Sequence, residues 1–233
     1  MGGFITVETL EGDGGFQVYR AEPAAKPKAA IIVIQEIFGV NAGIRARCDR
    51  WASKGYLALA PDLFWRVQPG VDLDPDVPAD FQQGIDYMMK FNVDDGVRDI
   101  EAVLRAARAA LGSGGKAGVV GYCLGGRMTY LASTRTDSDA SVAYYGGGID
   151  GALGESHAIA RPLMLHFAEE DHFIDAKARA AVHAALDANR HVTIHEYPGV
   201  DHGFATETGK RRVEDAANLA DSRTEAFFAQ HLG

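Results

Sequence analysis

The sequence has little cysteine, little basic charge and no long apolar run, and each shortage excludes a class of protein. Only 2 cysteines occur among 233 residues, too few for a disulfide scaffold, so we expect a reducing, cytoplasmic compartment. The longest apolar run, residues 29–34, is much shorter than a membrane span. No cationic segment followed by an apolar one opens the chain, so we expect no signal peptide.

The charge balance excludes a second group of functions. There are 32 acidic against 23 basic residues, a formal net charge of −9, which repels nucleic-acid phosphates and anionic membranes. We therefore expect neither nucleic acid nor membrane as a partner. The short basic cluster Lys210-Arg211-Arg212 is interpreted as the solvated start of a helix.

What the sequence has in plenty is apolar patterning, which predicts strands and helices in alternation. Continuous apolar runs such as residues 29–35 suit strands buried on both faces, and residues 3–8 and 16–20 alternate as an N-terminal antiparallel hairpin does. We expect one α/β domain over residues 1–233, with a mostly parallel central sheet flanked by helices on both faces. The further strands are predicted at 56–60, 116–121, 141–145, 163–167 and 191–197. The helices are predicted at 41–54, 92–111, 124–133, 175–190 and 211–231, with a loop at 61–78.

The segment Gly121-Tyr122-Cys123-Leu124-Gly125 follows a predicted strand and precedes a predicted helix. This G-x-C-x-G pattern is a nucleophile elbow with cysteine in place of serine. Side chains at the flanking positions would collide with backbone in so sharp a turn, and the helix N-terminus favours a thiolate. A small, buried and inert cysteine is the alternative interpretation.

A thiol nucleophile needs a base and an orienting acid. In α/β-hydrolases the chain order is nucleophile, acid, histidine, and Asp171 and His202 follow predicted strands in that order. The alternative bases are His166, interpreted as an inward strand residue, and His172. The alternative acids are Glu170, Asp175, interpreted as a helix N-cap, and Asp201.

The segment Gln35-Glu36-Ile37-Phe38-Gly39 follows the first buried strand. In this order of elements, the backbone N–H groups of Ile37 and Leu124 are expected to form an oxyanion hole. Glu36 has two interpretations that stay open here. In the first, Glu36 lies in an apolar loop, which raises the pKa of its carboxyl, and accepts the proton of the thiol. In the second, its carboxylate pairs with Arg45 or Arg127.

Six motifs in this order resemble the dienelactone hydrolase family: 35–41, Pro61-Asp62-Leu63, 121–126, Tyr144-Tyr145-Gly146, 171–173 and 202–204. The resemblance covers almost the whole chain and implies an α/β-hydrolase fold and a cofactor-free monomer. It implies Cys123 as nucleophile, Asp171 as acid and His202 as base. It also implies that Glu36 contacts the resting thiol and that Ile37 and Leu124 form the oxyanion hole.

The chain departs from this family in the residues that bind the substrate. Family members of the chlorocatechol pathway hold a carboxylate with two arginines, whereas the corresponding stretches here are Asp80-Phe81-Gln82 and Phe204-Ala205-Thr206. Either another cation replaces them, with Arg127 or Arg66 as candidates, or the substrate is not that carboxylate. We expect substrate contacts from Phe38, Trp65, Tyr87, Arg127, Tyr145, Phe173 and Phe204.

Three functions follow from these residues. The first is a cysteine-dependent hydrolase of small lactones or esters that works through an acyl-enzyme. The second is a general carboxylesterase or thioesterase with a more apolar pocket, which the missing arginines favour. The third is a ligand-binding scaffold without turnover, which would be expected to have a broken elbow or triad. A metal is not expected, because His191 and His195 lie on a predicted strand without a third ligand.

Overall fold

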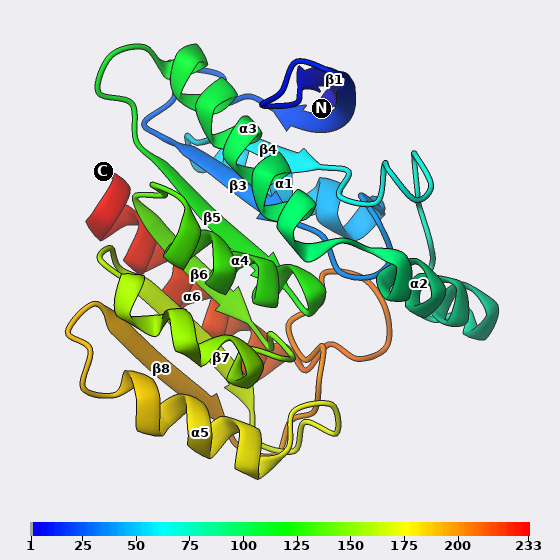
Figure 1. The fold of residues 1–233 in the computed structure, drawn as a ribbon, viewed down its shortest axis with the longest axis vertical. Helices are drawn as coiled ribbons and strands as arrows, with labels where there is room; N and C mark the ends of the chain where they lie inside the picture. Colours follow the sequence, from blue (N-terminus) through cyan, green and yellow to red (C-terminus); the bar gives the residue numbers. More distant parts are fainter. Residues whose placement is uncertain (1) are drawn as a thin grey trace.

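The apolar runs of the sequence form the centre of one eight-stranded sheet in the computed structural model, which describes residues 2–233 (Figure 1). Every residue of the five central strands is buried, as expected for strands covered on both faces. The sheet order is β1-β2-β4-β3-β5-β6-β7-β8. The strands are β1 (Gly3–Glu8), β2 (Gly15–Ala21), β3 (Ala30–Ile34), β4 (Leu57–Pro61), β5 (Ala117–Tyr122), β6 (Ala140–Tyr144), β7 (Leu163–Ala168) and β8 (Val192–Tyr197).

The sheet is mixed only at its N-terminal side. β2 pairs antiparallel with β1 and with β4, whereas β4, β3, β5, β6, β7 and β8 are parallel neighbours. This confirms the predicted parallel sheet with an N-terminal antiparallel hairpin. The carboxyl ends of the parallel strands meet at one edge, where ligands bind in sheets of this kind.

Helices cover both faces of the sheet (Figure 1). α3, α4 and α5 lie on one face, and α1 and α6 lie on the other, where Trp51 of α1 packs edge-on against Phe228 of α6. The helices are α1 (Ala42–Ser53), α2 (Pro78–Lys90), α3 (Val93–Leu111), α4 (Leu124–Arg135), α5 (Ala176–Leu186) and α6 (Glu214–Leu232), with a 3-10 helix, η1 (Asp150–Ala158). Within residues 2–233 no helix is both long and apolar enough to cross a membrane.

Local side chains set several helix starts. The Asn92 side chain accepts from the Asp94 N–H at 2.9 Å to begin α3, and Asp175 accepts from the Ala178 N–H at 2.7 Å to begin α5. Both N-caps confirm the sequence-based interpretation. Asn41 caps α1 in the same way.

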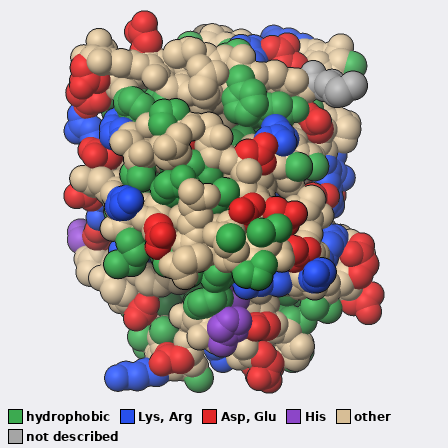
Figure 2. Space-filling view, turned by 90° about the vertical axis from the view of Figure 1, so that its right-hand side faces the viewer, with side chains coloured by type: hydrophobic (Ala, Val, Ile, Leu, Met, Phe, Trp, Pro, Cys, Tyr) green, Lys and Arg blue, Asp and Glu red, His purple; other side chains and the backbone are tan. Residues whose placement is uncertain are grey.

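Two elements differ from expectation, and both bear on the site. The sequence analysis predicted no helix at residues 78–90, where α2 projects from the body at the edge of the strand ends (Figure 1). The closing helix begins at Glu214, not at residue 211, so Arg211 lies in the loop before α6. Figure 2 shows the side of the molecule toward which α2 projects, with apolar side chains at the surface among mixed charges.

Candidate active site

Four segments that leave the carboxyl ends of parallel strands carry the candidate catalytic residues. Glu36 follows β3, Cys123 follows β5 directly, Asp171 follows β7 and His202 follows β8. Glu36, Cys123 and His202 line one cavity of about 500 Å³. The topology therefore gathers residues that lie up to 166 positions apart in the chain.

Cys123 occupies a strained turn between β5 and α4. Its φ is 54° and its ψ is −115°, in a region that side chains other than glycine rarely adopt. A Cβ on Gly125 would lie 2.5 Å from the Ile34 carbonyl oxygen, and a Cβ on Gly121 would collide with the Gly125 carbonyl. Glycine at both flanks is therefore a steric requirement of the turn, as the sequence pattern predicted.

Asp171 orients His202. The Nδ1 atom of His202 lies 2.9 Å from Asp171 Oδ2, and Asp171 Oδ1 accepts hydrogen bonds from the N–H groups of Phe173 and Ile174 at 2.9 and 3.1 Å. The two side chains are 4% and 0% exposed, so water does not compete for the pair. The other ring nitrogen, Nε2, is buried and has no hydrogen-bond partner within residues 2–233.

The electrostatics of His202 favour its charged form. Burial lowers the pKa of the imidazole, but the neighbouring Cys123 sulfur and the Asp171 carboxylate outweigh burial and raise the pKa to about 10. Such a histidine stabilises a thiolate beside it and holds a proton that it can give to a leaving group.

The alternative bases and acids have other partners. His166 is fully buried between the hydroxyls of Tyr197 and Thr224, and its pKa is lowered well below the usual value, first by burial. His172 pairs with Asp201 at 2.7 Å and lies half exposed. The Asp175 side chain caps the N-terminus of α5, and the Glu170 side chain is exposed.

Glu36 lies on the cavity without an ion pair in the described part of the chain. Arg45 pairs instead with Asp72 at 2.8 Å, and the hydroxyl of Thr206 donates to Glu36 Oε2 at 3.4 Å. Burial raises the pKa of the Glu36 carboxyl, although the charges of His202, Arg47 and Arg211 oppose it. The contact between Glu36 and the thiol that the resemblance implies is not among the hydrogen bonds of residues 2–233.

Ile37 and Leu124 present backbone N–H groups at the cavity that Cys123 also lines. The Ile37 N–H lies in the turn after β3 and donates no hydrogen bond within residues 2–233. Leu124 is the first residue of α4, where N–H groups lack a partner within the helix. Both residues line the cavity, and two free N–H groups there can donate hydrogen bonds to a negatively charged oxygen.

Apolar side chains make up most of the remaining cavity wall. Of the expected substrate contacts, Phe38, Arg127 and Phe173 line the cavity. The α2 side chains were missed, although Pro78 at a helix start and the spacing of Phe81, Ile85 and Met88 are signals of an amphipathic helix. The apolar lining comprises Ile37, Phe38, Phe81, Ile85, Met88, Met89, Phe91, Val93, Leu124 and Phe173.

Four expected contacts lie elsewhere, and these are corrections. Trp65 stacks on Phe16 and donates to Asp99, and Tyr87 packs on the core residue Phe64. Tyr145 and Phe204 are fully buried behind the site, where the Tyr145 ring packs against His202 with centroids 5.0 Å apart. These aromatic side chains support the core and do not line the cavity.

Two arginines line the cavity without an acidic partner. Arg127 and Arg211 form no ion pair within residues 2–233, and the Nε of Arg127 is buried without a hydrogen bond. The Arg211 guanidinium lies 5.0 Å from the centre of the Phe81 ring. Arg66, the other candidate from the sequence, pairs with Asp99 outside this cavity. Arg211 is exposed, as its interpretation as a solvated residue predicted, but it lies in the loop before α6 and not at the start of that helix.

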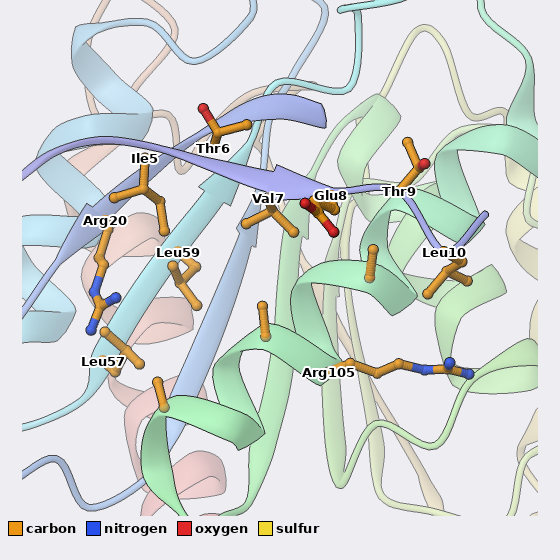
Figure 3. Close-up of a pocket in the computed structure, with 13 residues that line it drawn as sticks. Ile5, Thr6, Val7, Glu8, Thr9, Leu10, Arg20, Leu57, Leu59 and Arg105 are labelled. Atoms are coloured by element: carbon orange, nitrogen blue, oxygen red, sulfur yellow. The ribbon is translucent and has the colours of Figure 1, made fainter. Parts of the chain in front are cut away.

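A second hollow, of about 460 Å³, lies between β1, β4 and α3 (Figure 3). Ile5 and Val7 of β1 face Leu57 and Leu59 of β4 across it, and none of the candidate catalytic residues lines it. Among residues 2–233 no group of three or more His, Cys, Asp or Glu side chains is arranged to hold a metal ion.

Comparisons with known proteins agree on one family. The model of the "Dienelactone hydrolase family" matches residues 16–232. A protein of Azospirillum brasilense named "Putative carboxymethylenebutenolidase" is 43% identical over 223 residues, 95% of this chain and 96% of that one. The carboxymethylenebutenolidase of Pseudomonas putida is 35% identical over 97% of this chain and 95% of its own. A crystal structure named "Putative Dienelactone Hydrolase" from Klebsiella pneumoniae is similar at a TM-score of 0.82 and 28% identity, covering 99% of this chain and 98% of that one.

Proposed function

We propose that this chain, which belongs to the dienelactone hydrolase family, hydrolyses lactone and ester bonds through an acyl-enzyme formed on Cys123. One observation carries the proposal. The hydrogen bond from His202 Nδ1 to Asp171 Oδ2 orients an imidazole that lines the same cavity as Cys123. Family membership supports the reaction class, and this geometry supports the roles of the residues.

Acylation is the first half of the proposed reaction. The Cys123 thiolate adds to the carbonyl carbon of the substrate, and the resulting oxyanion accepts hydrogen bonds from the N–H groups of Ile37 and Leu124. The carbon–oxygen bond of the ester then breaks. The departing oxygen takes the proton of the His202 imidazolium, and a thioester remains on Cys123.

Deacylation returns the enzyme to its starting state. His202, now neutral, takes a proton from water as the hydroxide adds to the thioester carbonyl. The carbon–sulfur bond breaks and releases the acid, so the thiolate and the imidazolium are regenerated. Asp171 holds the imidazole tautomer in both halves.

Glu36 is proposed to accept the proton of the resting thiol. Its raised pKa, caused first by burial, makes its carboxylate a stronger base than an exposed one. It lies on the cavity beside the charges of His202, Arg47 and Arg211, which stabilise it before it takes the proton.

The positive charges at the cavity indicate the class of substrate. Arg127 and Arg211 are proposed to hold an anionic group of the substrate, such as a carboxylate, in place of the arginines that the stretches at Phe81 and Thr206 lack. Both side chains line the cavity and form no ion pair in the described chain, and a carboxylate of the substrate satisfies such a charge directly.

The second candidate is a general carboxylesterase or thioesterase. The apolar side chains of α2, together with Phe38 and Phe173, favour neutral substrates with a bulky hydrocarbon part. The two candidates share one catalytic mechanism and differ only in what binds beside it.

The test is steady-state hydrolysis of a dienelactone, its carboxylate-free analogue and a short aryl ester, with the Cys123→Ala protein as the blank. We expect the dienelactone to have the highest kcat/KM. Arg127→Met and Arg211→Met are each expected to raise its KM about tenfold, the loss of about 1.4 kcal/mol. Arg66→Met, whose charge lies outside the cavity, is the matched control and should leave KM unchanged.

Each outcome decides between the candidates. Preference for the neutral substrates would move the assignment to the general esterase. No activity above the blank on any substrate would contradict both and restore the ligand-binding scaffold. A burst of aryl alcohol before the steady state is also expected, because thioesters on cysteine hydrolyse slowly, and its absence would argue against rate-limiting deacylation.

A further inference from the structure

Arg47 is a buried arginine that does not line the cavity, and its hydrogen bonds play no part in the proposed reaction. It lies on α1 and is 5% exposed, whereas arginine almost never is buried without partners. Its partners are therefore informative. They come from the segment before the nucleophile, from the loop that carries the base, and from the last helix.

The first contact is with the residue that precedes Cys123. Arg47 Nη1 donates to the hydroxyl of Tyr122 at 2.8 Å, and the guanidinium carbon lies 3.9 Å from the centre of the Tyr122 ring. Tyr122 is 2% exposed and ends β5, so its position sets where the elbow starts.

The second contact is with the loop that follows His202. Arg47 Nη2 donates to the carbonyl oxygen of Ala205, three residues after His202, and lies 3.6 Å from the Glu207 carboxylate. Ala205 is fully buried. A buried carbonyl that accepts from a charged donor is held more firmly than one that faces water.

The third contact ties this group to α6. Asp221 lies 3.6 Å from Arg47 Nη1 and accepts from the Tyr144 hydroxyl at 3.2 Å. Arg50, one turn further along α1, pairs with the same Asp221 at 2.9 Å but is 35% exposed and, within residues 2–233, donates no hydrogen bond to Tyr122 or Ala205.

We propose that Arg47 is a positioning residue, which clamps the nucleophile elbow and the histidine loop together at the distance that the reaction needs. It touches neither Cys123 nor the cavity, and acts through Tyr122 on one side and Ala205 on the other. This inference rests on the proposed function, because it presumes that Cys123 and His202 react together. Lysine lacks the fork of donors that reaches both partners at once.

The test uses the full chain with Arg47→Met and Arg47→Lys, assayed on a short aryl ester. We expect Arg47→Met to lower kcat about 100-fold, the effect of a misplacement of about 1 Å, with KM changed by less than about twofold. Arg47→Lys keeps the charge and should recover part of kcat. Arg50→Met removes an arginine from the same helix and the same Asp221, and should leave kcat unchanged.

A second readout separates positioning from a purely structural role. The rate of alkylation of Cys123 by iodoacetamide should fall in folded Arg47→Met, because a displaced His202 stabilises the thiolate less. Cys48 is fully buried and does not contribute to fast labelling. A folded Arg47→Met protein with the kcat and labelling rate of Arg50→Met would overturn the proposal.

Two further variants keep the result decisive. If Arg47→Met fails to fold, Tyr122→Phe removes one anchor without burying a charge. We expect it to lower kcat severalfold, and an unchanged kcat there overturns the proposal.

Cys123→Ala distinguishes failure of the proposed function from failure of the Arg47 proposal alone. Full activity in Cys123→Ala overturns the proposed function and this inference with it, whereas an inactive Cys123→Ala beside a fully active Arg47→Met overturns this inference alone.

Discussion

The Asp171 carboxylate is held on both of its oxygens. Oδ1 accepts from two backbone N–H groups, and Oδ2 faces Nδ1 of His202. An acceptor-only group fixed in this way forces the ring proton onto Nδ1 and leaves Nε2 to exchange protons at the cavity.

Asp171→Asn should therefore abolish most of the activity. The amide presents a donor or a weaker acceptor to Nδ1, and the same change in a serine protease triad lowers kcat about 10⁴-fold. Steady-state kinetics on an aryl ester measure it. Glu170→Gln is the matched control, because that neighbouring carboxylate is exposed and makes no contact with His202 in the described residues. Equal losses in the two variants would contradict the assignment of Asp171 as the orienting acid.

The raised pKa of His202 predicts a pH dependence of stability. The folded pKa of about 10 lies above the ordinary value of 6.5, so the charged imidazole stabilises the fold fully below about pH 6.5. That contribution is lost as the pH rises toward 10. Thermal unfolding over this pH range should show a steeper fall of Tm in the wild type than in His202→Asn. Parallel curves would mean that His202 is not charged in the folded protein.

The turn between β5 and α4 decides whether Cys123, the proposed nucleophile, reaches the cavity. A methyl group on Gly121 would meet the backbone carbonyl of Gly125, at the start of α4, and the Thr129 hydroxyl further along the same helix. Nothing flexible can move aside, so the turn itself must shift.

Gly121→Ala should destabilise the protein by about 1–3 kcal/mol, the usual cost of overpacking, and should lower kcat as well because Cys123 moves with the turn. Urea unfolding and ester hydrolysis measure the two effects. Gly154→Ala is the control, since a Cβ there meets nothing within 4 Å and its φ is negative. A stable and fully active Gly121→Ala protein would contradict the steric account of the elbow.

All eight strands share one sheet, so the core should unfold as one cooperative unit. Phe228 of α6 is fully buried against Trp51, and its ring lies against Gly118 of β5. α6 covers the opposite face of the sheet from α3 and α4 (Figure 1). It lines no part of the catalytic cavity.

Phe228→Ala should cost about 3–5 kcal/mol of stability, because it leaves a cavity in the core, and should leave kcat unchanged where the protein is folded. Denaturant unfolding followed by fluorescence and by activity measures both, and the two curves should coincide. Leu219→Ala, on the same helix but 48% exposed, should change stability by less than about 0.5 kcal/mol. Separate transitions for fluorescence and activity would contradict the expectation of a single domain.

Local sequence patterns were sufficient to predict most of the fold. Continuous apolar runs marked the buried strands, Asn92 and Asp175 marked helix starts, and the spacing of two glycines around Cys123 marked the elbow. These features depend on backbone sterics and on contacts a few residues apart. Family membership, inferred from motifs in order, is confirmed by the comparisons.

The features that the sequence analysis missed depend on contacts across the molecule. α2 is the exception, because its apolar spacing was present in the sequence. Arg211 is exposed as predicted, but its place at the cavity depends on contacts that a basic cluster does not indicate. Trp65 and Tyr87 were expected at the cavity, but an aromatic side chain in a loop fits either a core or a pocket until its neighbours are known.

The sequence by itself therefore determined the order of strands and helices, the elbow and the family, since these follow from periodicity, glycine sterics and motif order. Tertiary structure alone decided that Asp171 rather than Asp201 faces the His202 ring, that Arg127 and Arg211 lie at the cavity without an ion pair in the described residues, and that Arg47 joins the end of β5 to the loop after His202. The physical reason is distance along the chain. Ion pairs and the burial of side chains depend on residues that lie tens to more than a hundred positions apart in the sequence. Only the packing of the sheet and its helices brings these residues together.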